Sequence, residues 1–249
     1  MIAAIRTEGL SKRYANGTLA LDAVNLTVSH GELLVILGPN GAGKTTLVRQ
    51  LTTELRPSGG TIEIFGVDAV RKPQRVKEFI GVVPQEAELF EHLTVSQHLY
   101  YFALFRGARS QQAKIAAREV LRELELDTRS AVAIKNLSGG LKRRTLVGLA
   151  LIMNPPLLIL DEPTAGLDPE SRRGLWDVLI RRKTAGTTIL ITTHYLEEAE
   201  GLADRIAIVS QGKLIALGRL DELGTRKRSI PAEKTNLTQV YFQLVRGDS

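Results

Sequence analysis

Residues 38–45 of the chain read GPNGAGKT and complete the pattern G-x-x-x-x-G-K-[ST]. The apolar run Leu33–Leu37 precedes them and is typical of a buried strand, and a helical run to Leu55 follows. In this strand–loop–helix setting the pattern forms a phosphate-binding loop. Its glycines let backbone N–H groups approach phosphate oxygens, Lys44 reaches the terminal phosphates, and Thr45 offers an oxygen to Mg²⁺. The sequence therefore predicts an α/β fold that binds a nucleotide.

A second apolar run, Leu157–Leu160, ends in Asp161 and Glu162. A strand buried on both faces has this composition, and the carboxyl ends of such strands open on a ligand crevice. One carboxylate there can hold Mg²⁺ through water while its neighbour orients an attacking water. Taken alone, the run also fits a strand that ends in charge at a solvated turn.

The turn Leu137-Ser138-Gly139-Gly140 precedes a helical stretch that runs to Met153. Ser138 is a natural N-cap residue, and the glycines bare backbone N–H groups at the positive end of the helix. Such a turn can bind an anion. A capped helix that binds nothing fits the same residues, so the turn carries weight only beside the other motifs.

These motifs lie in a chain of 249 residues that is 43% apolar and 24% charged, an ordinary globular composition. The net charge of +6 decides little, because the positive residues are scattered along the chain. No cysteine occurs, which excludes disulfides and thiolate metal sites. The N-terminal residues lack a signal-peptide pattern, and no apolar run approaches the ~20 residues that cross a bilayer. We therefore expect a cytosolic chain, and any membrane-spanning part must belong to another polypeptide.

The chain resembles the nucleotide-binding subunit of ATP-binding cassette (ABC) transporters over roughly residues 3–222. The motifs that carry the likeness occur in that family's order: the P-loop, Gln85, LSGG, LILDEP, AGLD and His194. The resemblance implies a P-loop NTPase fold with a parallel core sheet flanked by helices, an antiparallel N-terminal β-subdomain and a helical subdomain near 86–154. Short β-type runs between Ile2 and Val28 agree with that antiparallel sheet.

The resemblance also implies a role for each site residue. The expected catalytic residues are Lys44, which contacts the phosphates, Glu162, which acts as base or orients water, and His194, which steadies the γ-phosphate. The expected Mg²⁺ ligands are Thr45, Gln85 and Asp161. The expected ATP-binding residues are Tyr14, Gly38, Pro39, Asn40, Gly41, Ala42, Gly43, Lys44, Thr45, Thr46, Gln85, Ser138, Gly139, Gly140 and Asp168.

Several of these residues also have a plainer interpretation. The Tyr14 ring would stack on adenine, a contact worth ~1–3 kcal/mol in related settings, but a loop tyrosine is otherwise a surface anchor. Gln85 is otherwise a polar loop residue. Asp168, followed by Pro169, is expected to cap a helix in either case, and the resemblance places it at a dimer seam as well.

One departure from the family lies after LSGG, where a frequent glutamine is replaced by Leu141, followed by Lys142-Arg143-Arg144. We expect the site to survive, because the phosphate contacts implied for this motif come from Ser138 and the glycine backbone. The variant resembles the branch that serves exporters of drugs, lipids and other hydrophobic or surface molecules, which favours export over import. We expect the three cations to form a solvated helix face.

Residues 94–126 predict a helical lobe. Thr94–Gln97 fits a capping box that opens an apolar helix, and Ser110–Leu126 predicts a second helix with Ile115 on its apolar face. We expect most aromatic residues of the first helix in the core of the lobe. A part of them is expected to line the groove where a membrane partner's cytoplasmic helix docks. These aromatic residues are Tyr100, Tyr101, Phe102 and Phe105.

The C-terminal part of the chain predicts a basic linker at 223–234 and a short amphipathic helix within 235–249, after an ATPase domain at 1–222. We expect this helix to pack on its own domain or on a dimer mate. Docking at a membrane surface is less favoured, because the polar face carries few cations.

A single chain holds one P-loop and one LSGG turn, and the family places the LSGG of one subunit against the ATP of the other. The resemblance therefore implies a head-to-tail dimer, of identical or different subunits, with ATP and Mg²⁺ as cofactors. It implies that hydrolysis drives movement of a cargo through a separate integral membrane permease. The chain would then lie at the cytoplasmic face of the membrane.

Two other functions are weighed against this one. A nucleic-acid or ribosome-associated ABC ATPase usually has two cassettes in one chain or long coiled-coil inserts, which this chain lacks, so no nucleic-acid partner is expected. A small-molecule P-loop kinase would leave LSGG and His194 unexplained. The cargo itself is not encoded here, because the path through the membrane belongs to another polypeptide.

Overall fold

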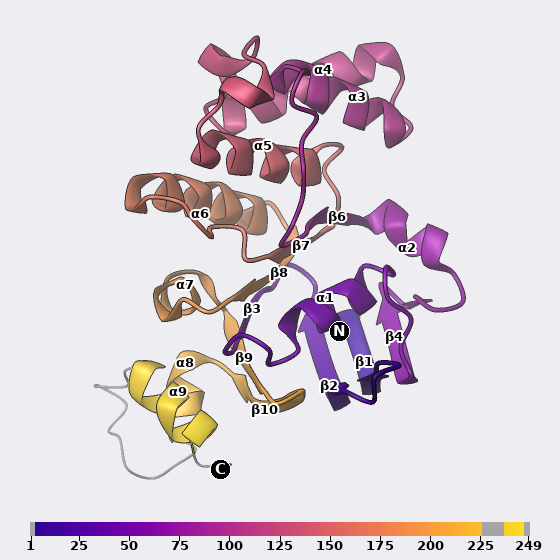
Figure 1. The fold of residues 1–249 in the computed structure, drawn as a ribbon, viewed down its shortest axis with the longest axis vertical. Coiled ribbons are helices and arrows are strands. Elements are labelled where there is room, and N and C mark those ends of the chain that lie inside the picture. Colours follow the sequence, from indigo (N-terminus) through magenta and orange to yellow (C-terminus); the bar gives the residue numbers. More distant parts are fainter. Residues whose placement is uncertain (1–2, 226–236, 247–249) are drawn as a thin grey trace.

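The computed structural model describes residues 3–225 and 237–246, and Figure 1 shows their arrangement. The strands are β1 (Ala3–Arg13), β2 (Leu19–Ser29), β3 (Leu33–Leu37), β4 (Gly59–Ile64), β5 (Val67–Asp68), β6 (Ile80–Val83), β7 (Leu157–Asp161), β8 (Thr188–Thr193), β9 (Arg205–Ser210) and β10 (Lys213–Gly218). The helices are α1 (Lys44–Leu51), α2 (Pro73–Phe79), α3 (Val95–Phe105), α4 (Ser110–Glu123), α5 (Gly139–Leu151), α6 (Pro169–Thr184), α7 (Leu196–Leu202), α8 (Leu220–Thr225) and α9 (Leu237–Arg246). Two short 3₁₀ turns, Asp127–Arg129 and Ile134–Asn136, lead from α4 to α5.

The core is a six-stranded sheet in the order β10-β9-β3-β8-β7-β6. Strands β6, β7, β8, β3 and β9 run parallel, and β10 returns antiparallel to β9. Every residue of β3, β7 and β8 is buried, as expected for parallel strands covered on both faces. In register, Leu37 pairs with Thr193 and Asp161 with Thr192, so these three strands end at one edge of the sheet.

A second sheet, in the order β2-β1-β4-β5, is antiparallel and lies at the lower right of Figure 1. The expected antiparallel sheet is therefore present, but β1 and β2 are continuous 11-residue strands rather than several short runs. The pairing of β1 with β2 has several register shifts, and Ala23 has a φ of 51°. These irregularities interrupt the alternation of apolar and polar residues, so the sequence pattern suggests separate short strands.

Helices α3, α4 and α5 form a lobe at the top of Figure 1. The predicted capping box is present, since Thr94 accepts from the Gln97 N–H and the Gln97 side chain accepts from the Thr94 N–H. The prediction that most aromatic residues of α3 lie in the core is wrong, because Tyr101, Phe102 and Phe105 are 42%, 37% and 84% exposed. The lobe instead packs small and aliphatic residues: Val95, Leu99, Ala103, Ala113, Ala117, Val120 and Leu121.

Two further expectations differ from the structure. Ile115 is 48% exposed, since the buried face of α4 is carried by residues such as Ala113 and Ala117. Helix α1 ends at Leu51 rather than at Leu55, because Thr53 has a φ of 65°, outside the helical region.

The C-terminal helix α9 contacts α7, α8 and β10, and it buries Leu237 and Val240. The Leu237 N–H donates to Glu200 on α7 at 3.1 Å. Helix α8 includes residues 223–225 of the expected basic linker, and the rest of that linker lies outside the described residues. Among the residues that the structure describes, no helix combines the length and apolarity needed to cross a bilayer.

Candidate active site

The phosphate-binding loop joins β3 to α1 and is packed tightly against two other strands. A Cβ atom on Gly38 would lie 2.3 Å from the Val209 carbonyl oxygen, and one on Gly43 would lie 2.5 Å from that of Ala20. Gly43 also has a φ of 105°, a conformation that glycine adopts without strain. No side chain caps α1, so its first N–H groups remain available to an anion.

A cavity of about 380 Å³ opens over this loop. The P-loop, Gln85 and Glu162 line it, as the sequence predicts, but further lining residues come from the end of the β1–β2 turn, the start of β2 and the β9–β10 turn. Gly212 in the second turn donates to the Ala42 carbonyl and accepts from the Asp22 N–H, at 3.0 and 2.9 Å. Both turns are visible in the sequence, but nothing in it says that they meet the P-loop. The lining residues are Thr18, Leu19, Ala20, Asn40, Gly41, Gly43, Lys44, Thr45, Thr46, Gln85, Glu162, Gln211 and Gly212.

Lys44 is 5% exposed and lies between the P-loop and the end of β7. Its Nζ donates to the carbonyls of Gly38 and Pro39 at 2.8 and 3.2 Å and lies 3.8 Å from Oε1 of Glu162. Burial lowers the pKa of Lys44, and the charges of Glu162 and Asp161 act in the opposite direction. The ammonium is therefore held at the place where phosphate oxygens would replace the carbonyls.

Asp161 ends β7 and is 1% exposed. Its Oδ1 accepts from the Thr192 hydroxyl, whereas its Oδ2 is buried with no hydrogen-bond partner in the described structure. Burial raises the pKa of Asp161, and the hydrogen bond from Thr192 is the largest effect that opposes it. The Thr45 hydroxyl donates to Oε1 of Gln85 at 3.0 Å.

This set of a carboxylate, a hydroxyl and an amide oxygen fits Mg²⁺, which prefers oxygen ligands. The unpartnered Oδ2 of Asp161 is the atom that such a cation would satisfy. No cluster of three or more His, Cys, Asp or Glu side chains suited to a metal occurs in residues 3–225 or 237–246. Any Mg²⁺ at this site would therefore complete its shell with nucleotide oxygens and water.

Glu162 follows directly and turns away from the strand. Its φ is 49°, which for a residue with a side chain stores local strain of ~1–3 kcal/mol. Its N–H donates to the Thr192 carbonyl and hydroxyl at 3.0 and 3.2 Å, which holds the turn. The carboxylate, 11% exposed, lies 3.1 Å from Nδ1 of His194. Glu162 thus contacts both Lys44 and His194 at the edge of the cavity.

Tyr14 does not line the cavity, although its hydroxyl lies 3.2 Å from the Thr46 hydroxyl, which does. Lys12 lies over the Tyr14 ring, with Nζ 5.6 Å from its centroid. The ring is half-buried beside the P-loop helix. Its predicted stacking on adenine stays a prediction.

The LSGG turn and Asp168 also lie outside this cavity. Ser138 caps α5 by accepting from the Leu141 N–H at 3.4 Å, and Asp168 caps α6 through Ser171. Hydrogen bonds from Ser171 lower the pKa of Asp168. The two caps are neighbours, since a Cβ on Gly140 would lie 3.7 Å from the Ser171 hydroxyl. The LSGG turn and the Asp168 cap are therefore neighbours, and neither lines the cavity over the chain's own P-loop.

Sequence reasoning missed two polar links near the site. Arg143, expected on a solvated face, instead donates to main-chain carbonyls at the end of β7. Glu198 of α7 is fully buried and accepts from the Thr164 hydroxyl and, at 3.3 Å, from the Trp176 indole. Helix α7 reads LEEAEGL, with three glutamates, so its sequence pattern does not single out Glu198 for burial.

Known proteins resemble this chain in sequence and in fold. The family described as ABC transporter matches residues 21–165. The daunorubicin resistance ATP-binding protein DrrA2 of Streptomyces coeruleorubidus is 39% identical over 248 residues, which cover 98% of this chain and 77% of that protein. The chain belongs to the ABC transporter family. As an ABC ATPase it binds ATP, and it has the predicted P-loop NTPase fold.

Other relatives of this ABC ATPase differ in length. The daunorubicin/doxorubicin resistance ATP-binding protein DrrA of Streptomyces peucetius is 44% identical over 220 residues, 88% of this chain and 66% of that protein. The chain thus spans about two thirds of that relative. The phospholipid-transporting ATPase ABCA3 of Mus musculus is 38% identical over 221 residues, 88% of this chain but 13% of that protein.

Solved ABC structures have the same fold. An ATP-binding subunit of an ABC transporter superposes with a TM-score of 0.86 at 29% identity, covering 97% of this chain and 99% of that one. A dimeric ATP-binding cassette in a post-hydrolysis state, bound to ADP and Pi, superposes with a TM-score of 0.80 at 27% identity, covering 87% of this chain and 98% of that one.

Proposed function

We propose that the chain is the ATP-hydrolysing subunit of an ABC exporter, works as a head-to-tail dimer, and lies at the cytoplasmic face of the membrane on a separate permease. The observation that carries the proposal is the cluster of Lys44, Glu162 and His194 at the carboxyl edge of the sheet, with contacts of 3.8 and 3.1 Å. That cluster supplies a cation for phosphates and a carboxylate–imidazole pair for a water.

The separation between the P-loop cavity and the LSGG turn supports the dimer. Ser138, Gly140 and Asp168 lie on one surface of the subunit and do not line its own cavity. In a head-to-tail pair each subunit would present that surface to the ATP of its partner. The dimeric cassette among the similar structures, bound to ADP and Pi, supports this assembly.

The cycle begins when the P-loop backbone and the N-terminus of α1 bind the phosphates. Lys44 exchanges the carbonyls of Gly38 and Pro39 for phosphate oxygens, and its charge balances the triphosphate. The Tyr14 ring holds adenine from the side of Thr46. Bound Mg²⁺ would lie among Thr45, Gln85 and Asp161 and would neutralise charge that develops on the phosphates.

Hydrolysis then depends on Glu162 and His194. Glu162 accepts a proton from the water whose oxygen bonds to the γ-phosphorus, the bond from the γ-phosphorus to the bridging oxygen breaks, and ADP leaves with that oxygen. His194 donates to the γ-phosphate and holds it in line with the water. The contact between Glu162 and His194 at 3.1 Å fixes the two groups relative to each other. ATP binding favours the closed dimer and hydrolysis favours the open one, because only the triphosphate bridges both subunits.

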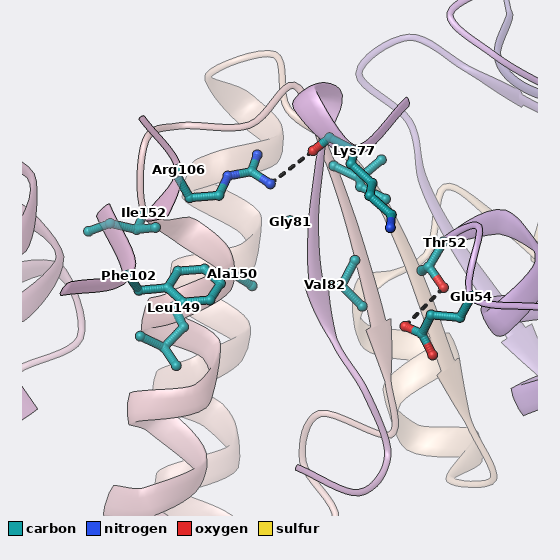
Figure 2. Close-up of a pocket in the computed structure, with 11 residues that line it drawn as sticks. Thr52, Glu54, Lys77, Gly81, Val82, Phe102, Arg106, Leu149, Ala150 and Ile152 are labelled. Atoms are coloured by element: carbon teal, nitrogen blue, oxygen red, sulfur yellow. Dashed lines mark hydrogen bonds between the residues drawn. The ribbon is translucent and has the colours of Figure 1, made fainter. Parts of the chain in front are cut away.

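The permease contact is assigned to a groove between the helical lobe and β6 (Figure 2), with a volume of about 290 Å³. Phe102 of α3 and Leu149 of α5 lie on one side of it, and Val82 and Thr52 lie on the other. Its floor is close-packed, since a Cβ on Gly81 would lie 2.1 Å from the Ala150 carbonyl oxygen.

Arg106 bridges one end of this groove by donating to the Lys77 carbonyl at 2.9 Å. The exposed apolar wall formed by Phe102 and Leu149 fits an amphipathic helix in a groove. Arg106 and Lys77 at one end of the groove carry positive charge, and Glu54 on the side of Thr52 carries negative charge, so the groove offers both signs to polar residues of that helix. The groove thus supports docking of a short cytoplasmic helix of the permease.

The cargo class is proposed from the relatives. Those named above are drug-resistance ATP-binding proteins and a phospholipid-transporting ATPase. An apolar or amphiphilic cargo, moved outward, is consistent with those names and with the Leu141-Lys142-Arg143-Arg144 variant of the signature segment.

The experiment that tests the function compares wild type with Glu162→Gln in phosphate release and size-exclusion chromatography with ATP and Mg²⁺. We expect the wild type to turn over, and Glu162→Gln to lose turnover while it forms an ATP-stabilised dimer. Glu119→Gln, at an exposed position of α4, is the matched control and should behave as wild type. Rapid turnover by Glu162→Gln would contradict the proposal, and salt-sensitive binding to DNA or RNA would favour a nucleic-acid function.

A further inference from the structure

Arg143 lies one turn beyond the LSGG residues on α5, and its guanidinium group faces the carboxyl end of the core sheet. All of its hydrogen bonds in the described structure go to main-chain carbonyl oxygens. Nη2 donates to Asp161 at 2.9 Å and to Glu162 at 2.7 Å, Nε donates to Pro163 at 2.9 Å, and Nη1 donates to Pro84 at 3.4 Å.

These acceptors belong to two segments that carry the nucleotide chemistry. Asp161–Pro163 is the turn in which Glu162 adopts its positive φ of 49°. Pro84 comes directly before Gln85, whose amide oxygen accepts from the Thr45 hydroxyl. One planar guanidinium group therefore joins the two segments to α5.

The neighbouring cations have different surroundings. Arg144 donates through Nη1 to the Leu124 carbonyl and to Glu125, both at 3.4 Å, inside the helical lobe. The Lys142 side chain has no hydrogen bond or ion pair to another described residue. Of these three cations, Arg143 alone touches the Glu162 turn, so its neighbours serve as matched controls.

The half-buried guanidinium group remains an ion in this position. Burial lowers the pKa of Arg143, and the charges of Asp161 and Glu162 act against that effect. The three bonds to the Glu162 turn are 2.7–2.9 Å long, as expected for a charged donor, whereas the bond to Pro84 is longer. A lysine at the same position has one nitrogen and cannot reproduce the planar fork.

We propose that Arg143 is a positioning residue that couples the two ATP sites of the dimer. It rigidly joins the α5 end that serves the partner's ATP to the turn that aims Glu162 at the subunit's own ATP. The inference rests on the head-to-tail dimer proposed above. Arg143 itself contacts neither nucleotide and acts through the two segments that it joins.

The test uses two copies of the full chain joined by a flexible linker, with one hydrolytic site removed by Glu162→Gln in the second copy. In one form Arg143→Lys is placed in the first copy, where it acts on that copy's own Glu162. In the other form it is placed in the second copy, where it acts only through the LSGG turn. Phosphate release gives kcat and KM, and thermal unfolding reports stability.

We expect kcat to fall about tenfold or more in both forms, with KM changed by less than about twofold. Lys142→Gln and Arg144→Lys in the same places should leave kcat unchanged. A structural role alone would lower the unfolding temperature without this split between kcat and KM.

Other outcomes overturn the inference. A fall in kcat only when Arg143→Lys shares a copy with the active Glu162 would overturn the coupling of the two sites. An unchanged kcat in both forms would overturn the positioning role. The proposed function would still stand if the tandem protein with Arg143 intact in both copies hydrolyses ATP. If the tandem protein with Arg143 intact in both copies is inactive, both the positioning role of Arg143 and the proposed function are overturned.

Discussion

Nδ1 of His194 lies 3.1 Å from Oε1 of Glu162, although 32 residues separate them in the chain. The parallel pairing of β7 with β8 brings them together, because Asp161 is in register with Thr192. Glu162 and His194 each follow directly after the last residue of their strand. The contact therefore depends on the sheet register, and the 3.8 Å contact between Lys44 and Glu162 extends the same cluster.

His194→Ala should lower kcat by about 10²–10⁴, because the γ-phosphate would lose the imidazole that orients it and Glu162 would lose the contact that positions it as the base. ATP affinity should remain, since the P-loop and Lys44 are intact. Phosphate release and equilibrium nucleotide titration separate the two effects. His92→Ala, at an exposed position, is the control. A variant with wild-type kcat would remove His194 from the mechanism.

Lys44→Ala should weaken ATP binding by about tenfold or more, because a charge-assisted contact to the phosphates is lost. Isothermal titration calorimetry of the variant measures this directly. Lys72→Ala, at an exposed position before α2, should bind ATP as the wild type does. Equal affinities of Lys44→Ala and wild type would refute the phosphate role of Lys44.

His98 predicts a pH dependence of stability. It is 5% exposed, its Nε2 accepts from the Phe90 N–H at 2.9 Å, and its Nδ1 lies 3.1 Å from the Thr94 carbonyl. Burial lowers the pKa of His98 below its ordinary value, against the effect of that carbonyl. The unfolded chain therefore takes up the proton first as the pH falls.

The stabilisation by neutral His98 is then complete above about pH 6.5, the ordinary histidine value, and is lost as the pH falls through the folded pKa. The free energy of unfolding of wild type should fall more steeply below about pH 6.5 than that of His98→Gln. Denaturant titrations at several pH values give both slopes, and His92→Gln is the control. Parallel slopes for wild type and His98→Gln would rule out this contribution.

Gly81→Ala should destabilise the fold by about 1–3 kcal/mol or more, because the added Cβ would lie 2.1 Å from the Ala150 carbonyl oxygen. The comparison is Gly139→Ala at the start of α5, where an added Cβ meets nothing within 4 Å. Chemical denaturation of both variants measures the difference. Equal stabilities would show that β6 and α5 can separate at no cost.

Phe102→Ala should reduce co-purification of the permease from mild detergent while basal ATP hydrolysis remains within about twofold of wild type. Phe102 lines the groove and is 37% exposed, so it contributes apolar surface to a partner. Ile115→Ala, 48% exposed on α4 and outside this groove, is the control. Equal permease recovery with both variants would move the docking surface elsewhere.

The sequence predicts the parts of the site that follow from local chemistry. The glycines and Lys44 of the P-loop, the strand that ends in Asp161, and the helix cap at Asp168 each have a short-range pattern, and the structure has all of them in the expected elements. These residues lie close together because of the order of the parallel strands, which no single motif predicts.

The features that sequence reasoning missed depend on distant contacts. Ala20 at the start of β2 and Gly212 in the β9–β10 turn both line the cavity. They do so because these two segments, far apart in the sequence, meet beside the P-loop. Arg143 is a charged residue between two other cations, a pattern typical of a solvated helix face. Its acceptors are backbone carbonyls, which every residue carries, so the sequence does not reveal them. The aromatic residues of α3 were predicted in the core because hydrophobicity alone does not separate a core from an interface such as that proposed for Phe102.

The most direct test of the proposed dimer is complementation between two inactive forms of the chain. Lys44→Ala removes a subunit's own phosphate site, and Ser138→Arg blocks the LSGG turn that it offers to a partner. Each form alone should be inactive. In an equal mixture, each dimer of the two forms has one intact site, made of the P-loop of the Ser138→Arg form and the LSGG turn of the Lys44→Ala form. The mixture should therefore release phosphate in a single-turnover measurement. No phosphate release from the mixture, with folded protein in both preparations, would contradict the account that a partner's LSGG turn completes each ATP site.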